Sequence, residues 1–159
     1  MDQSKKAKAA GLVFILLTAL TILFIFSRSL HNAQTSALES GSIVNFLGVF
    51  FTEIGMTQEQ ADFFVRKTAH FSEFFIMGTF LTLAVQKNSR KTLIKNLFFI
   101  LFFLLAVPVC DETLQYLSPG RSPEVKDVLL DFSGALCGFL LVFLIDRLCF
   151  HFNSKKRGK

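Results

Sequence analysis

The sequence lacks several features that mark soluble enzymes and disulfide-stabilised domains. It has no tryptophan. Its cysteines are three, an odd number, and they lack Cys-x-x-Cys spacing. It also lacks a glycine-rich phosphate loop, Gly-x-Ser-x-Gly and His-Glu-x-x-His. These absences exclude the common zinc, disulfide, nucleotide and hydrolase signatures. We interpret Cys110, Cys137 and Cys149 as small apolar packing residues.

Long uncharged runs take the place of such motifs. Hydrophobic residues make up 52% of the 159-residue chain, and 21 of them are Phe. The run 9–26 is without charge, and at about 1.5 Å per residue it crosses most of a hydrocarbon core of about 30 Å. It exceeds a usual signal-peptide core, and no Ala-x-Ala site follows it. We predict an all-α, multi-pass membrane protein, a single domain over residues 1–159 with about four transmembrane helices at about 9–27, 66–86, 95–116 and 127–150.

The basic residues predict how these spans are oriented. Of 17 Lys and Arg, three lie in the N-terminal leader, four at 87–95 and five near the C-terminus. The positive-inside rule therefore predicts an N-in/C-in topology. The segments 28–67 and 116–127 are then extracytoplasmic. The net charge of +5 needs no nucleic-acid partner, because the basic residues flank the membrane.

The segment between the first two spans has two parts. Residues 27–42 are rich in Ser, Asn, Gln and Thr, which is typical of a solvated loop. Apolar residues then recur at helical spacing, which predicts a short extracytoplasmic amphipathic helix over 43–54. This helix would lie on the membrane surface or pack against the ends of the spans. The capping-box spacing of Thr57 and Gln60 predicts that the next helix begins at about Gln58.

Polar residues of three spans fall at one depth. Counted from the cytoplasmic ends of their helices, His70 and Glu112 lie about 24 Å up and Asp131 about 22 Å up. All three would lie about 6 to 8 Å below the outer boundary of the hydrocarbon core. Ionisable groups at such a depth are costly and indicate a pairing network or a function.

Helical spacing also predicts which residues share a face. One face of the second span carries Arg66, His70 and Glu73, and Lys67 borders it. In the fourth span the shared face consists of Asp127, Asp131, Gly134 and Gly138, and the two glycines have the spacing of a helix-packing pair. We therefore expect the acidic face of the fourth span to be buried.

Acids outnumber bases in this region. Five carboxylates face at most four cations, so some carboxylates would be protonated, ion-paired or bound to a cation. A divalent cation held by oxygen ligands would suit the surplus. The acids that could hold it are Glu73, Asp111, Glu112 and Asp127.

Two segments resemble a known family. RKTAHFSEFFIMG, residues 66–78, resembles the first motif of the VanZ-like family, and DETLQYLSPGRSPEVKDVLLDFSGALCG, residues 111–138, resembles its second. The matching positions are Lys67, His70, Phe71, Glu73, Asp111, Glu112, Gln115, Pro119, Gly120, Arg121, Asp127, Gly134 and Gly138. Asp131 stands where the family has asparagine at least as often. The resemblance implies a multi-pass protein of the bacterial cytoplasmic membrane. It also implies a role at the cell envelope in reduced susceptibility to teicoplanin-type glycopeptides.

The sequence is compatible with several functions. The polar residues could form an outward-facing site that binds or alters an envelope component or a membrane lipid, through Lys67, Gln115, Arg121, Asp127 and Asp131. An intramembrane transferase or hydrolase could instead act on a lipid-linked or wall-polymer substrate, with catalytic candidates His70, Glu73, Asp111 and Glu112. A purely structural polar clasp is the third reading. Transport would need a homo-oligomer, because about four spans without a repeat are few for one path.

Overall fold

The protein is helical throughout the part that the structure describes. The computed structural model describes residues 3–88 and 92–157, and these form seven helices and no strand. The helices are α1 (Gln3–Ser29), α2 (Ala33–Phe46), α3 (Gly48–Glu53), α4 (Gln58–Asn88), α5 (Thr92–Lys95), α6 (Leu97–Tyr116) and α7 (Val125–Arg157). The predicted all-α fold is confirmed.

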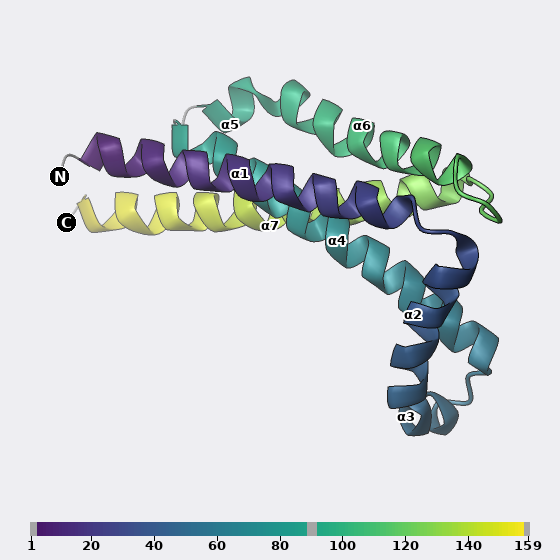
Figure 1. Cartoon of the computed structure of the whole chain (residues 1–159). Helices are drawn as coiled ribbons and strands as arrows, with labels where there is room; N and C mark the ends of the chain where they lie inside the picture. Colours follow the sequence, from purple (N-terminus) through teal and green to yellow (C-terminus); the bar gives the residue numbers. More distant parts are fainter. Residues whose placement is uncertain (1–2, 89–91, 158–159) are drawn as a thin grey trace.

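Four of these helices, α1, α4, α6 and α7, are long and apolar enough to cross a membrane. They form the bundle in Figure 1, from which the N-terminal half of α4 projects together with α2 and α3. Large apolar side chains such as Leu20, Leu23 and Phe98 are exposed on the bundle, as expected of a surface in contact with lipid. The prediction of four transmembrane helices is confirmed.

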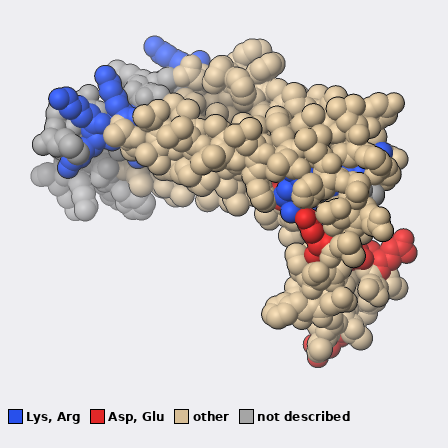
Figure 2. Space-filling view, in the orientation of Figure 1, with Lys and Arg blue, Asp and Glu red and all other residues tan. Residues whose placement is uncertain are grey.

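Both termini lie at the same end of the bundle, as the predicted N-in/C-in topology requires (Figure 1). In the face shown in Figure 2, Lys and Arg gather mainly at this end, whereas the acids lie at the other end and on the projecting segment. Arg90, Lys91 and Lys159, which contribute to the positive-inside prediction, lie outside the described residues. The orientation in the membrane stays a prediction.

The core of the bundle consists of apolar side chains from all four long helices. Ile25, Phe74, Ile100 and Leu104 are fully buried, and Ala135 packs with them. The three cysteines do not belong to this core. All three are exposed, so the interpretation of these cysteines as packing residues was wrong. They lie on the outward faces of α6 and α7, where a small apolar side chain meets lipid as readily as protein.

Glycines bring α4 and α7 into backbone contact. A Cβ atom added to Gly138 would lie 2.2 Å from the carbonyl oxygen of Phe75, and one on Gly134 would lie 2.4 Å from that of Phe71. Gly78 of α4 makes the reciprocal contact, 2.2 Å from the carbonyl oxygen of Ala135. Only glycine permits such an approach. The expected burial of the acidic face of α7 holds for Asp131, whereas Asp127 is partly exposed and lines a pocket.

The segment between α1 and α4 differs from the prediction in two respects. Residues 33–42 form most of α2 and are not a solvated loop. The Asn32 side chain accepts a hydrogen bond from the N–H of Thr35, and Ser40 and Ser42 donate to carbonyls of the preceding turn. The polar residues are thus satisfied within a helix. The predicted helix over 43–54 is interrupted at Leu47, and Gly48, a weak helix former, begins α3.

Most of the predicted apolar stripe in this segment is exposed. Phe51 packs with Val44 against Ala61 of α4, whereas Ile43, Phe46 and the other stripe residues do not join a core. α4 begins at Gln58 as predicted, and the capping box is formed: Thr57 donates its N–H to Gln60 Oε1 at 2.9 Å, and Gln60 donates its N–H to Thr57 Oγ1 at 3.3 Å. The placement of this exposed stripe on the membrane surface stays a prediction.

Candidate functional site

Polar side chains from α4, α6 and α7 meet at the end of the bundle opposite the termini. His70, Asp111 and Asp131 each offer one metal-ligand atom, and these atoms all lie within 4.8 Å of one another. His70 Nδ1 is 4.0 Å from Asp131 Oδ1. The depth count correctly predicted that three helices bring polar groups to one level. Of the two adjacent acids in α6, however, Asp111 faces this cluster and Glu112 does not belong to it.

Asp111 is held by neutral donors. It is fully buried, and it accepts hydrogen bonds from the hydroxyl of Ser29 in α1 and from Gln115 Nε2, the latter at 3.0 Å. The hydroxyl of Ser118 donates in turn to the carbonyl oxygen of Ser29 at 2.9 Å. Sequence reasoning missed both serines, because serine in an apolar helix usually bonds back to its own helix, as Ser29 also does to Ile25, and serine in a loop, such as Ser118, usually marks a turn. Asp111 therefore links the outer ends of α1 and α6.

Two further acids, Asp127 and Glu73, form ion pairs with cations of other helices. Lys67 of α4 pairs with Asp127 of α7. Arg28, at the end of α1, pairs with Glu73 of α4 at 3.2 Å and with Glu39 of α2 at 2.8 Å. Sequence reasoning missed Arg28, because a cation at the end of a span is ordinarily an interfacial residue. These pairs join helices, as a structural clasp requires, but among the described residues the guanidinium groups of Arg66 and Arg121 form no ion pair.

Glu112 secures the loop between α6 and α7. Its Oε1 atom accepts a hydrogen bond of 2.7 Å from the backbone N–H of Glu124, the residue immediately before α7. A carboxylate is favoured there by the unpaired N–H groups and the dipole of the helix N-terminus. The contact fixes both the start of α7 and the loop that carries Arg121.

We expect Glu112→Ala to destabilise the protein by about 1 to 2 kcal/mol, because it removes this charge-assisted hydrogen bond. SDS-induced unfolding in mixed micelles, followed by circular dichroism, measures the change. Glu112→Gln retains an acceptor oxygen and should lose less than the alanine variant. Equal losses in both variants would show that the hydrogen bond to Glu124 is not what stabilises the loop.

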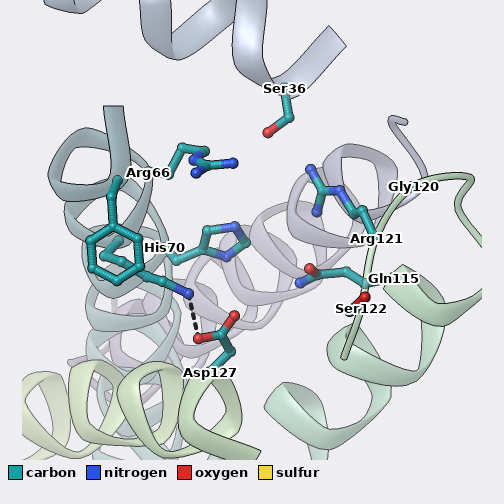
Figure 3. A pocket seen from close by; sticks show the side chains of 10 residues that line it. Ser36, Arg66, His70, Gln115, Gly120, Arg121, Ser122 and Asp127 are labelled. Atoms are coloured by element: carbon teal, nitrogen blue, oxygen red, sulfur yellow. Dashed lines mark hydrogen bonds and ion pairs between the residues drawn. The ribbon is translucent and has the colours of Figure 1, made fainter. Parts of the chain in front are cut away.

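A pocket of about 200 Å³ opens above the polar cluster. It is lined by Ser36, Phe63, Arg66, Lys67, His70, Gln115, Gly120, Arg121, Ser122 and Asp127. Figure 3 shows Arg66 and Arg121 entering from opposite sides, with the His70 ring between them. In the part of the chain that the structure describes, neither guanidinium forms an ion pair or a hydrogen bond. Two unpaired cations thus converge on one pocket.

The surroundings of Arg121 change the pKa of its guanidinium. Burial lowers the pKa of the Arg121 guanidinium below its ordinary value. The carboxylate of Asp111 opposes this change, and the like charge of Arg66 lowers the pKa further. Arginine nevertheless stays charged at physiological pH. The pocket is therefore a positively charged recess with a carboxylate beneath it.

The structure divides the predicted site residues into two groups. Lys67, His70, Gln115, Arg121 and Asp127 line the pocket, and Asp131 lies beside His70. The four acids predicted as cation ligands, Glu73, Asp111, Glu112 and Asp127, do not form one group. Glu73 and Asp127 have basic partners, Glu112 has a backbone partner, and Asp111 clusters with His70 and Asp131.

A bundle of four membrane-crossing helices with a polar pocket at one end defines an integral, multi-pass membrane protein. The family model described as VanZ/LLP1 matches residues 13–146, which is most of the chain. The protein belongs to this family, as the two sequence motifs predicted. No curated protein and no solved structure gave a match.

Proposed function

We propose that this protein acts at the bacterial cell envelope, in the cytoplasmic membrane. Its outward-facing pocket binds an anionic group of an envelope component, and this binding reduces susceptibility to teicoplanin-type glycopeptides. The observation that carries the proposal is the convergence of two unpaired guanidinium groups, Arg66 and Arg121, on one pocket. The predicted N-in/C-in topology directs this end of the bundle away from the cytoplasm.

The chemistry of the lining favours a phosphate-type anion. Arginine presents a planar set of donors that matches phosphate and carboxylate oxygens, and the charge-assisted bonds are stronger than neutral ones. Gln115 and Ser122 add neutral polar groups to the same walls. The apolar exterior of the bundle would leave the acyl or isoprenoid part of a lipid-linked component in the bilayer. The ligand class is therefore a phosphate headgroup of a membrane lipid or of a lipid-linked wall precursor.

The proposal is tested by replacing the arginines. Arg66→Ala and Arg121→Ala should each weaken binding of labelled lipid-linked wall precursor to the purified protein by at least about tenfold, since each removes charged hydrogen bonds of about 1.5 to 3 kcal/mol. Both variants should also restore teicoplanin susceptibility at unchanged membrane abundance. Lys126→Ala is the matched control, because Lys126 is exposed and does not line the pocket. Binding by both arginine variants at the level of the control would refute the proposal.

An intramembrane transferase or hydrolase is the second candidate, and one observation favours it. His70 lines the pocket, and its Nδ1 atom is buried without a hydrogen-bond partner beside Asp131. A histidine with an acid nearby is a candidate general base. The acid next to His70 Nδ1 is Asp131, whereas Glu73, the predicted orienting acid, pairs with Arg28. Turnover of labelled lipid precursors that stops in His70→Ala would support this reading, and turnover unaffected by the substitution would remove the proposed base.

A further inference from the structure

Two buried polar atoms in the cluster lack partners. His70 Nδ1 and Asp131 Oδ1 are both inaccessible to solvent and, among the described residues, accept or donate no hydrogen bond. Asp131 is 1% exposed, so water cannot easily compensate for the missing bond. An unpaired polar atom at such a position costs about 1 to 3 kcal/mol, and a charged one costs more. The two atoms lie 4.0 Å apart and belong to different helices.

No described Lys or Arg forms an ion pair with the two acids of the cluster. Asp111 and Asp131 are both buried, and the described partners of Asp111 are the neutral side chains of Ser29 and Gln115. Lys67 pairs with Asp127 and Arg28 with Glu73, whereas Arg66 and Arg121 line the pocket without an ion pair to either acid. Two carboxylates in a membrane-spanning bundle need compensation, and no described Lys or Arg supplies it through a direct ion pair.

We propose that His70, Asp111 and Asp131 bind one divalent metal ion. A 2+ ion balances two carboxylates, and it provides the missing partner for both orphaned atoms. Ligand atoms around such an ion lie about 3 to 4.4 Å apart, because each is about 2.0 to 2.2 Å from the metal. The three side chains already place one ligand atom each within 4.8 Å of the others. This limit exceeds the upper end of the expected range by only about 0.4 Å, so small side-chain movements suffice.

The donor set favours a first-row transition ion over Ca²⁺ or Mg²⁺. One imidazole nitrogen with two carboxylate oxygens suits Zn²⁺ or Mn²⁺, whereas Ca²⁺ and Mg²⁺ prefer oxygen ligands alone. Ser29 and Gln115 would orient Asp111, which is the role that hydrogen-bond donors behind a ligand ordinarily have. This ligand set differs from the four acids that the sequence indicated, because it contains a histidine and Asp131.

The pocket borders the proposed metal site on the side of His70. The His70 side chain is 25% exposed and lines the pocket, whereas Asp131 is buried behind it. Three protein ligands with an open side are typical of catalytic rather than structural zinc sites. An anion held by Arg66 and Arg121 would enter the pocket that His70 lines. Metal binding itself does not depend on the proposed function, because it requires no envelope component.

Metal content of the purified full-length chain tests the inference. The protein is stripped with EDTA in detergent, equilibrated with Zn²⁺ or Mn²⁺, freed of excess ion and analysed by mass spectrometry. We expect about one ion per chain, the stoichiometry of a single three-ligand site. Asp131→Asn should weaken binding by at least about 100-fold, and Ser29→Ala by about tenfold, as for loss of a ligand and of a supporting donor. Asp146→Asn is the matched control in the same helix, because Asp146 bonds to Gln86 far from the cluster.

A second measurement keeps the test valid if Asp131→Asn does not fold. Pulsed electron paramagnetic resonance of the Mn²⁺-loaded wild-type protein should reveal a directly coordinated nitrogen, which His70→Gln should remove. Substoichiometric binding of both ions by the wild-type protein would overturn the inference. So would stoichiometric binding without a nitrogen ligand, or unchanged affinity in a folded Asp131→Asn variant. None of these results would affect the test of the arginines, so the two proposals can fail separately.

Discussion

Gly138→Ala is expected to destabilise the protein by at least about 2 kcal/mol, although alanine is the better helix former by about 1 kcal/mol. The added Cβ would lie 2.2 Å from the carbonyl oxygen of Phe75 and 2.8 Å from the backbone nitrogen of Thr79. Both atoms belong to the backbone of α4, so no side-chain rotation relieves the clash. α7 would have to move away from α4 by about 1 Å, which opens the most intimate contact of the bundle. SDS-induced unfolding followed by circular dichroism measures the loss.

The same substitution at Gly41 provides the matched control. A Cβ at Gly41 meets no atom within 4 Å, and Gly41 lies inside α2. Gly41→Ala should therefore leave the stability unchanged or raise it by up to about 1 kcal/mol, through the lower entropy of the unfolded chain. If Gly138→Ala behaves like Gly41→Ala, the close approach of α4 and α7 is not required for stability.

Arg28→Ala should destabilise the protein by about 2 to 3 kcal/mol. The substitution leaves Glu73, whose side chain is 16% exposed, without its cation, and it also removes the partner of Glu39. Loss of one member of a fully buried pair costs about 3 to 5 kcal/mol, and the expected value is lower here because solvent reaches part of Arg28. The same unfolding assay measures this variant, and Lys126→Ala should change the stability by less than about 0.5 kcal/mol as a surface control.

A double-mutant cycle separates the ion pair from other effects of Arg28. Glu73→Gln removes the charge that Arg28→Ala strands, so the double variant should recover most of the lost stability. The coupling energy between the two positions should then be about 1 to 2 kcal/mol. Additive losses in the double variant would mean that Arg28 stabilises the protein through its contacts with Glu39 and Phe24 rather than through Glu73.

The sequence predicted the parts of the fold that depend on long apolar runs and on strong local signals. Each transmembrane helix has such a run, and the capping box of Thr57 and Gln60 correctly predicted the start of α4. The path of residues 33–42 was not predictable in this way, because serine favours loops unless its side chain bonds within the helix. The reciprocal role of Gly78 also went unnoticed, since a single glycine gives no spacing pattern.

The candidate site was predicted as a region more accurately than as a set of contacts. Counting residues along each helix places a side chain in depth, and this brought His70 and Asp131 to the correct level. Depth alone does not determine rotation: Asp111 and Glu112 differ by about 100° around α6, and the count could not distinguish them. The pairing of Arg28 and Ser29 with distant residues depends on how α1 packs, which no motif in α1 indicates.

The residues of the polar cluster come from separate helices, and this affects when the cluster can form during biosynthesis. Asp111 enters the bilayer with α6 at a cost below the value of about 2.5 to 3.5 kcal/mol for an aspartate at mid-membrane, because it lies nearer the outer end of the helix. Each Leu or Phe of that helix offsets about 0.3 to 0.6 kcal/mol of this cost. The favourable free energy of inserting the phenylalanine-rich first half of α6 thus offsets the cost of inserting the acid that follows it. Asp131 arrives with α7, which is synthesised after α4 and α6. A chain that stalls or is truncated before α7 therefore holds His70 and Asp111 without their third member, and only a completely inserted protein possesses the site.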